Sequence, residues 1–212
     1  MDIKMNLTID PRSLTRLYDA NQRIAVFRRI GAAASRNASP KVAWIVFSPF
    51  QNNRIAWSDK YYLYASSAST IPGAPVEMNT VSIGAMQPDW SYTFENGVFV
   101  GSQDAGKGIR LMNNMQTPTL RFGLAQGATV NGVSQFTPIN AVPLLYREEM
   151  NLTPDTRFEI ALSSCDRSGS FAGHVRGKPL AISPGKASMV KTSVVNVGFN
   201  PNNNRFYLIN IV

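Results

Sequence analysis

The side chains best suited to catalysis are few and widely separated. Cys165 is the single cysteine and His174 the single histidine, so a thiolate with an imidazole base is the one Cys–His pair that the composition offers. A lone cysteine is commonly buried and inert, and a lone histidine is more often a surface residue than a base. No serine stands in a G-x-S-x-G elbow. One cysteine also excludes an intramolecular disulfide framework and a zinc site of several thiolates.

A second candidate for chemistry is the segment Gly101–Gly108, which fits the pattern G-x-x-x-x-G-K of a phosphate-binding loop. Gly108 stands where a Ser or Thr would hold magnesium, and residues 109–114 are too short and Asn-rich for the helix that should follow. The neighbours Glu148 and Glu149 would point to opposite faces of a strand and cannot pair as acid and base. The sequence therefore predicts no enzyme, no metal and no cofactor.

Aromatic residues are concentrated in one region of the chain. All three tryptophans and four of the seven tyrosines lie between residues 44 and 92. Alternation in a strand over 60–66 puts Tyr61 on one face and Tyr62 on the other, so some tyrosine must approach the surface. Such side chains suit stacking on a sugar, insertion at a lipid headgroup boundary or a protein interface, while core packing remains the alternative. The predicted ligand-binding residues are Trp57, Tyr61, Tyr62, Trp90 and Tyr92.

Positive charge is the other concentrated feature. The formal net charge is +8, made up of +5 in residues 1–41, −2 in 42–164 and +5 in 165–212. If the two terminal segments lie near each other, the fold carries one basic face that attracts nucleic acid, anionic lipid or sulfated glycan. Simple solvation of exposed strands is the alternative. The predicted polyanion-binding residues are Arg23, Arg28, Arg29 and Arg36, and any contact with nucleic acid is expected to be non-specific because no RNA-binding signature is present.

Strand signals dominate the elements that must position these residues. Short runs rich in Val, Ile, Phe, Tyr and Trp alternate with clusters of Gly, Pro, Asn, Asp and Ser. Asn96-Gly97 and Asn131-Gly132 predict type I′ turns within hairpins over 91–100 and 129–134. Further strands are predicted near 3–9, 22–30, 41–48, 60–66, 76–83, 107–112, 119–126, 139–146, 156–164, 173–182, 188–199 and 205–212.

One segment reads as a helix: after Pro11, Ser13 could cap residues 14–20. Many strands without periodic helices between them predict an all-β fold. We expect a single antiparallel β-sandwich domain over residues 1–212, with jelly-roll and Greek-key topologies both open and one short N-terminal helix. The 44% hydrophobic content suits a buried core. The start lacks an apolar signal region and no run of about 18 apolar residues occurs, which favours a cytoplasmic origin.

Residues 42–50 (VAWIVFSPF), followed by Asn53, Ile55, Trp57, Tyr61 and residues 64–66, resemble small β-sandwich proteins of bacteria and fungi that have no established function. Residues 122–132 (FGLAQGATVNG) share the likeness, which covers about a third of the chain. The resemblance implies the fold and transfers no site or activity.

Two functions fit these observations. The first is a non-enzymatic protein that binds a glycan or an anionic membrane surface through exposed aromatics and basic terminal strands. The second is a structural protein that assembles into a shell, filament or inclusion and packs a polyanion. The apolar C-terminal strand, residues 205–212, motivates the second, because such an edge can pair with another copy of the chain.

Overall fold

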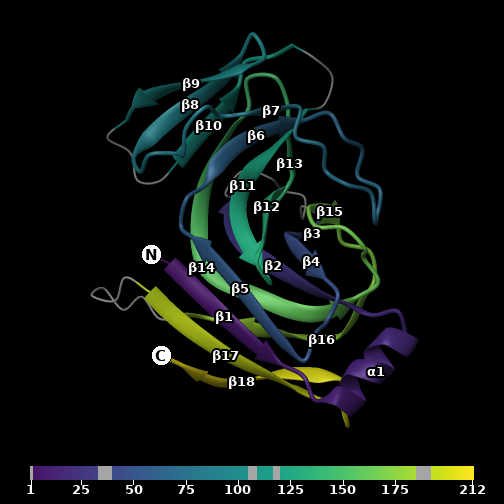
Figure 1. Ribbon diagram of the computed structural model, residues 1–212. Coiled ribbons are helices and arrows are strands. Elements are labelled where there is room, and N and C mark those ends of the chain that lie inside the picture. The colour runs from purple at the N-terminus through teal and green to yellow at the C-terminus, as the bar shows by residue number, and fades with distance from the viewer. Residues whose placement is uncertain (1, 33–39, 105–108, 117–119, 185–191) are drawn as a thin grey trace.

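A computed structural model describes residues 2–32, 40–104, 109–116, 120–184 and 192–212, which form eighteen strands and one helix (Figure 1). The elements are β1 (Asp2–Thr8), α1 (Pro11–Asp19), β2 (Arg23–Ala32), β3 (Val42–Ala43), β4 (Ile45–Phe47), β5 (Asn52–Ser58), β6 (Tyr62–Ser66), β7 (Thr80–Val81), β8 (Trp90–Glu95), β9 (Val98–Gln103), β10 (Ile109–Asn113), β11 (Leu120–Val130), β12 (Val133–Pro138), β13 (Val142–Leu144), β14 (Glu149–Ser163), β15 (Ser170–Phe171), β16 (Val175–Ile182), β17 (Thr192–Asn200) and β18 (Arg205–Ile211). The prediction of an all-β fold with one short N-terminal helix is confirmed.

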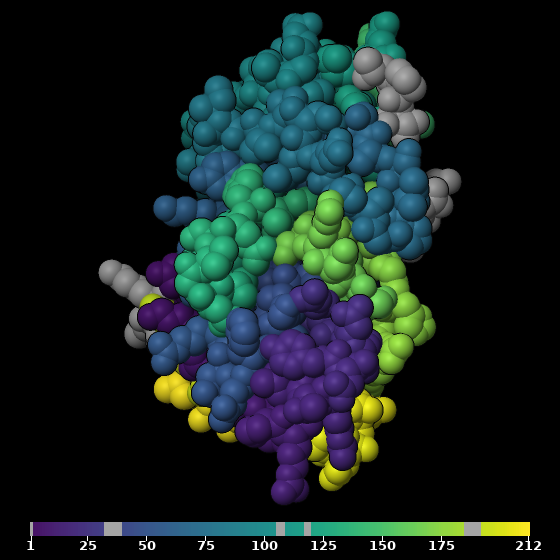
Figure 2. All heavy atoms as spheres, turned by 45° about the vertical axis from the view of Figure 1, so that its right-hand side comes forward, coloured from purple at the N-terminus to yellow at the C-terminus, as the bar shows by residue number. Residues whose placement is uncertain are grey.

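The strands form two large curled sheets in a sandwich-like arrangement (Figure 1). The wide sheet has nine strands in the order β18-β17-β1-β5-β11-β6-β7, with β12 and β13 also paired to β11. The narrow sheet has seven strands in the order β4-β2-β14-β10-β8-β9, with β16 also paired to β14. A short ribbon of β3 and β15 stands apart from both. Figure 2 shows β8 and β9 (teal) at one end of the molecule and α1 (purple) at the other.

The expectation of purely antiparallel sheets is wrong for two strand pairs. β1 pairs with β17 in parallel, and β10 pairs with β8 in parallel. β1 and β17 come from opposite ends of the chain, so no hairpin fixes their relative direction. β8 and β9 form a hairpin with β9 at the edge, and the chain then returns to the free side of β8.

The core follows from period-two alternation along the strands. In β1, Ile3, Met5 and Leu7 are fully buried while their neighbours face outward. The register places Met5 beside Val195 of β17 and Ile55 of β5. β5 is a strand that the sequence analysis did not predict, because its polar start, Asn52 to Arg54, resembles a turn.

Two turns and the helix show how local sequence sets local structure. Asn96-Gly97 and Asn131-Gly132 all have positive φ, between 49° and 87°, as type I′ hairpin turns require. The helix begins one turn earlier than predicted: Asp10 is the N-cap, and its carboxylate accepts the Ser13 N–H at 3.0 Å. Within the described part of the chain, no helix has the length and apolarity to span a membrane.

Candidate functional site

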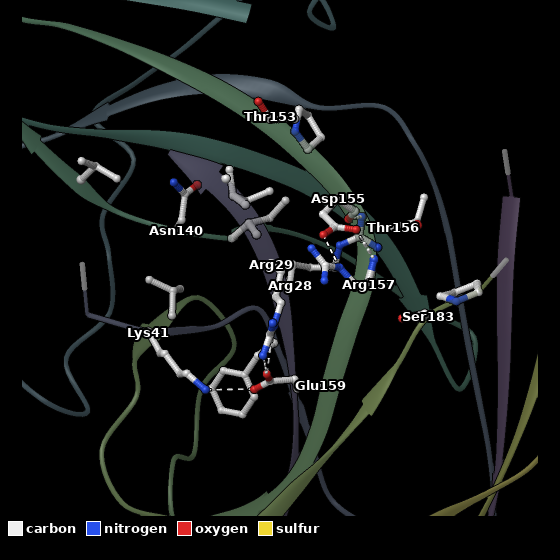
Figure 3. A pocket seen from close by; sticks show the side chains of 18 of the residues that line it. Arg28, Arg29, Lys41, Asn140, Thr153, Asp155, Thr156, Arg157, Glu159 and Ser183 are labelled. Carbon is white, nitrogen blue, oxygen red and sulfur yellow. Dashed lines mark hydrogen bonds and ion pairs between the residues drawn. The ribbon is translucent and has the colours of Figure 1, made fainter. Parts of the chain in front are cut away.

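A cleft of about 870 Å³ opens where β2 runs beside the middle of its neighbouring strand β14 (Figure 3). We call it the basic cleft, because its described lining includes four cationic side chains and two carboxylates: Arg28, Arg29, Lys41, Arg157, Asp155 and Glu159. Uncharged polar residues and aliphatic side chains also line the cleft, among them Asn140, Thr153, Thr156, Ser183, Ile30, Ile139 and Val142. The cleft therefore combines an excess of positive charge with neutral hydrogen-bonding groups.

A bulge in β14 creates this cleft. Pro154 pairs with Ile30 of β2, but the next paired residue is Phe158, opposite Arg28. Proline has no N–H to give to the ladder, so the strand separates there and residues 155–157 bow away from β2. The carbonyl of Asp155 is thereby freed from the ladder and accepts a hydrogen bond from Arg28 Nη2 at 2.9 Å.

Arg28 lines the basic cleft, but its side chain is buried beneath the cleft surface. Its side chain has no exposed surface, because β2 alternation points it between the sheets. The guanidinium carbon lies 5.5 Å from the ring centroid of Trp44, 5.8 Å from Trp57 and 5.9 Å from Tyr61. Such stacking favours a cation within an apolar interior.

The hydrogen-bonding capacity of Arg28 is only partly used. Nη2 donates to Tyr61 Oη at 2.6 Å and lies 3.9 Å from Asp59 Oδ1, whereas Nε and Nη1 are buried without a hydrogen-bond partner. A buried donor left unpaired costs about 1–3 kcal/mol, and more when it is charged. Burial also raises the pKa of Tyr61 to about 12, with the Arg28 charge opposing that shift, so Tyr61 stays a neutral phenol beside the cation.

Charged side chains form the rim of the basic cleft. Arg29 Nη2 lies 2.7 Å from one carboxylate oxygen of Glu159, and Lys41 Nζ lies 2.9 Å from the other (Figure 3). Burial alone would raise the pKa of Glu159, but hydrogen bonds and charge from Lys41 and Arg29 outweigh it and hold the pKa below its ordinary value. Asp155 likewise pairs with Arg157 across the bulge.

Asn140 supplies a neutral donor to the cleft. Its Oδ1 accepts the Leu124 N–H at 2.9 Å, and its backbone carbonyl accepts the Tyr64 hydroxyl. Gly123 permits this approach, because a Cβ there would collide with the Asn140 carbonyl. With Oδ1 occupied, Asn140 Nδ2 remains buried without a partner. Two residues that line the basic cleft, Arg28 and Asn140, therefore carry buried N–H groups without a hydrogen-bond partner.

The structure brings together two of the four predicted polyanion-binding residues. Arg28 and Arg29 line the basic cleft, whereas Arg23 bonds to Ser48 outside it and Arg36 lies outside the described residues. Sequence reasoning missed Lys41, Arg157 and Asn140, which come from three other segments. The available signal was Pro154 inside a run of strand-forming residues, which marks an irregular strand.

The predicted aromatic residues do not form one site. Trp57 is 5% exposed and Tyr61 is 9% exposed, so the expectation that both lie on the surface is wrong; their rings pack around Arg28 instead. Tyr62, Trp90 and Tyr92 are half-buried. Trp90 and Tyr92 lie together on β8 of the narrow sheet, while Tyr62 contacts Phe136 on the wide sheet.

The candidate catalytic residues Cys165 and His174 lie in different environments. Cys165 is buried and its thiol donates to the Arg167 carbonyl, whereas His174 is exposed just before β16. Gly101 belongs to strand β9, and residues 105–108 of the G-x-x-x-x-G-K segment lie outside the described residues. In the described ranges, no three His, Cys, Asp or Glu side chains gather to hold a metal ion.

Comparison of the chain with protein-family models, with curated proteins and with solved structures gives no match. The resemblance to bacterial and fungal β-sandwich proteins therefore stays a prediction. Any functional conclusion must come from the geometry of the site itself.

Proposed function

We propose that this protein is a non-catalytic binding protein that recognises an acidic glycan in the basic cleft. The observation that carries the proposal is the rim of that cleft, where the Arg29 and Lys41 side chains are 55% and 60% exposed. A carboxylate or sulfate oxygen would accept hydrogen bonds from these two cations, and bonds to charged groups contribute about 1.5–3 kcal/mol each.

The remaining lining supports a sugar as the carrier of that acid. Thr153, Thr156 and Ser183 offer neutral groups that suit a polyhydroxylated ligand. A nucleobase would need an open aromatic face, and Phe27, the one aromatic residue in the described lining, already lies under Lys41 Nζ at 5.8 Å. A concave cleft also suits a discrete ligand better than a flat anionic membrane.

The proposal is tested by titration calorimetry with an oligogalacturonate, a sulfated heparin tetrasaccharide and neutral maltotetraose. We expect one or both acidic ligands to bind in the cleft and maltotetraose to give no binding heat from it. The double variant Arg29→Ala/Lys41→Ala should weaken binding about tenfold. Lys4→Ala, which removes an exposed charge from β1, is the matched control and should bind like the unmodified protein.

Urea unfolding of each variant separates lost binding from lost folding. Failure of both acidic ligands to bind, or equal binding by the control and the double variant, contradicts the proposal. Binding to vesicles of phosphatidylserine but to neither saccharide would instead assign the cleft to a lipid surface.

A second candidate, assembly of identical chains, is favoured by β18. This edge strand of the wide sheet exposes Tyr207, Leu208, Ile209 and Ile211, and has no further partner among the described strands of that sheet. Edge strands usually carry charges or proline that prevent pairing with another chain. A row of amides also leads to this edge: Asn6 donates to Asn196 at 3.0 Å, and Asn196 donates to Asn210 of β18 at 2.6 Å.

A further inference from the structure

A hollow of about 460 Å³ lies at the end of the molecule that carries α1. Most of its described lining comes from α1, the start of β16 and the turn between β17 and β18 (Figure 1). We call it the arginine hollow, because the charged side chains of its described lining are Arg16 and Arg176. Its volume is within the range of small-ligand sites, and it shares no lining residue with the basic cleft.

The two arginines come from opposite ends of the chain, and both are exposed. Arg16 lies in the last turn of α1. Arg176 lies at the start of β16, opposite Leu162 of β14, and the register between these strands shifts directly after it. Gly177, which also lines the hollow, has a φ of 73° and turns the strand at this irregularity. Two local features, the end of a helix and a bulge, therefore bring the arginines to one hollow.

The charge of the arginine hollow is uncompensated within the described part of the chain. The described lining holds no carboxylate, and no ion pair among the described residues involves Arg16 or Arg176. The basic cleft differs, because Glu159 there already pairs with Arg29 and Lys41. Cations around one hollow repel each other, and an anion bound between them replaces that repulsion by attraction. The arginine hollow therefore favours an anionic ligand.

The turn between β17 and β18 adds a neutral donor. Asn203 is exposed and lines the hollow, and its Oδ1 accepts the Arg205 backbone N–H at 3.1 Å. This hydrogen bond orients the amide and leaves its Nδ2 group as the donor for a ligand. Gln22 also lines the hollow, but its side chain is buried and donates to the Ala20 carbonyl at 2.9 Å. We therefore count Asn203, and not Gln22, as a ligand contact.

Charge and shape select one class of anion for this set of donors. A guanidinium group presents a planar fork of N–H groups that binds two oxygens of a carboxylate or phosphate at once. A carboxylate has one negative charge and two oxygens, so it fills one fork and leaves the second arginine without an acid. A phosphate with two ionisable oxygens carries a charge of about −1.5 to −2 at pH 7 and has three strong acceptor oxygens. That anion matches two guanidinium groups and a neutral amide.

We propose that the arginine hollow binds a dianionic phosphate group. Arg16 and Arg176 donate to the phosphate oxygens from two sides, and Asn203 Nδ2 donates a further hydrogen bond. Free inorganic phosphate and the monoester of a phosphorylated small molecule both supply this chemistry, and the experiment separates the two sources. The proposal goes beyond acidic-glycan binding, because no lining residue is common to the two sites.

The test is titration calorimetry at pH 7 with inorganic phosphate, glucose 6-phosphate and adenosine 5′-monophosphate. Dimethyl phosphate, which carries one negative charge, and acetate are the control ligands. We expect at least one of the three phosphates to bind saturably, and both control ligands to bind at least tenfold more weakly. Tighter binding by a monoester than by inorganic phosphate identifies a phosphorylated small molecule as the ligand, and the reverse order identifies the free ion.

Variants locate the binding in the arginine hollow. Arg16→Gln/Arg176→Gln removes both guanidinium groups and should weaken phosphate binding at least tenfold, and each single variant should weaken it at least threefold. Arg54→Gln, which removes an exposed cation of β5 outside the hollow, is the matched control and should bind like the unmodified protein. Arg29→Ala/Lys41→Ala should also leave phosphate binding unchanged, so failure of this site and failure of the basic cleft are distinguishable. Urea unfolding confirms that each variant is folded.

Three results would overturn the inference: no binding of any of the three phosphates, equal binding of dimethyl phosphate, or unchanged binding by the folded arginine variants. A single-stranded oligodeoxynucleotide without a terminal phosphate is titrated in parallel. Binding of this oligonucleotide without binding of the three phosphates would also overturn the inference, and would assign the two arginines to contacts with a nucleic-acid backbone.

Discussion

At the scale of single residues, the cations of the basic cleft differ in how fully their hydrogen-bonding groups are already paired within the protein. Arg28 is solvated by rings, a phenol and a backbone carbonyl, which leaves part of its donor capacity free. Glu159, by contrast, occupies both Arg29 and Lys41. An acidic ligand at the rim must therefore share or displace the contacts that Glu159 makes. If the cleft binds an acidic ligand as proposed, Glu159 would compete with that ligand for the two cations and lower its affinity.

The variant Glu159→Gln tests this competition. Removing the carboxylate releases the two cations, Arg29 and Lys41, and also removes a negative charge that would repel an acidic ligand. We therefore expect an acidic ligand to bind roughly threefold to tenfold more tightly, equivalent to about 1 kcal/mol. Titration calorimetry with the ligand identified for the unmodified protein measures the change. Weaker binding by Glu159→Gln would show that the carboxylate contacts the ligand favourably.

The same variant has an expected pH dependence. The pKa of Glu159 is lower in the folded protein than its ordinary value of 4.5, so its ion pairs stabilise the fold above that pH. At pH 7 the unmodified protein should exceed Glu159→Gln by about 1 kcal/mol in free energy of unfolding. The difference should fade as the pH falls through the folded pKa, below 4.5. Urea unfolding at pH 7 and pH 3 measures both limits, and an unchanged difference would contradict the argument.

Residue-level prediction from sequence succeeded and failed for a common reason. Alternation correctly separates the two faces of a strand, but it does not say which face another layer covers. The charge of Arg28 predicts an exposed residue, and nothing in the neighbouring sequence indicates that its face of β2 turns inward. The sequence also predicts Trp57 and Tyr61 as surface aromatics, yet both rings lie beside the buried guanidinium of Arg28. Only the packing of β5 and β6 against β2 decides the outcome.

At the scale of elements, an irregular strand creates the basic cleft. The register shift in β14 between Pro154 and Phe158 opens it. The sequence predicted the regular devices well, including the Asn96-Gly97 and Asn131-Gly132 turns, because their backbone conformation is dictated by local residue type. It did not predict β5, and it began the strand now seen as β14 after Pro154, because a bulge depends on the neighbouring strand.

Two glycines of β11 provide a matched test of how this strand positions Asn140. A Cβ on Gly123 would overlap the Asn140 carbonyl and lie 2.8 Å from Tyr64 Cε1, whereas a Cβ on Gly127 would find its nearest neighbour at 3.9 Å. We expect Gly123→Ala to lower the free energy of unfolding by about 1–3 kcal/mol, and Gly127→Ala to change it by less than about 1 kcal/mol. Urea unfolding followed by tryptophan fluorescence compares them, and equal effects would contradict the assigned role of Gly123.

At the scale of the whole molecule, the basic chain ends meet in part. Arg16 of α1 and Arg176 of β16 line one hollow of about 460 Å³, so the N- and C-terminal segments do share a surface. The basic cleft instead combines N-terminal Arg28, Arg29 and Lys41 with Arg157 from the middle of the chain. The net charges of the three chain segments could not predict which basic residues lie together in either hollow, because both sets depend on the strand order of the narrow sheet.

The free edge of the wide sheet bears on assembly at this same scale. Antiparallel pairing of β18 with β18 of a second copy would join two wide sheets about a two-fold axis and cover apolar side chains on both faces. The amide row Asn6–Asn196–Asn210 ends at this edge, where a further strand could continue it. At β18, exposed apolar side chains lie on the same edge strand as Asn210, the last residue of the amide row.

A charge placed on β18 should therefore prevent self-association. Ile209 is 56% exposed, and Ile209→Lys would bring a cation into the interface that a second β18 must dehydrate. Ile83→Lys is the matched control, because Ile83 is fully exposed but lies in a loop outside the sheets. By sedimentation velocity we expect the unmodified protein and Ile83→Lys to associate with rising concentration, and Ile209→Lys to remain monomeric. A monomeric unmodified protein at the highest concentration, or association by Ile209→Lys to the same extent, would mean that β18 is a solvated edge and would contradict assembly through this strand.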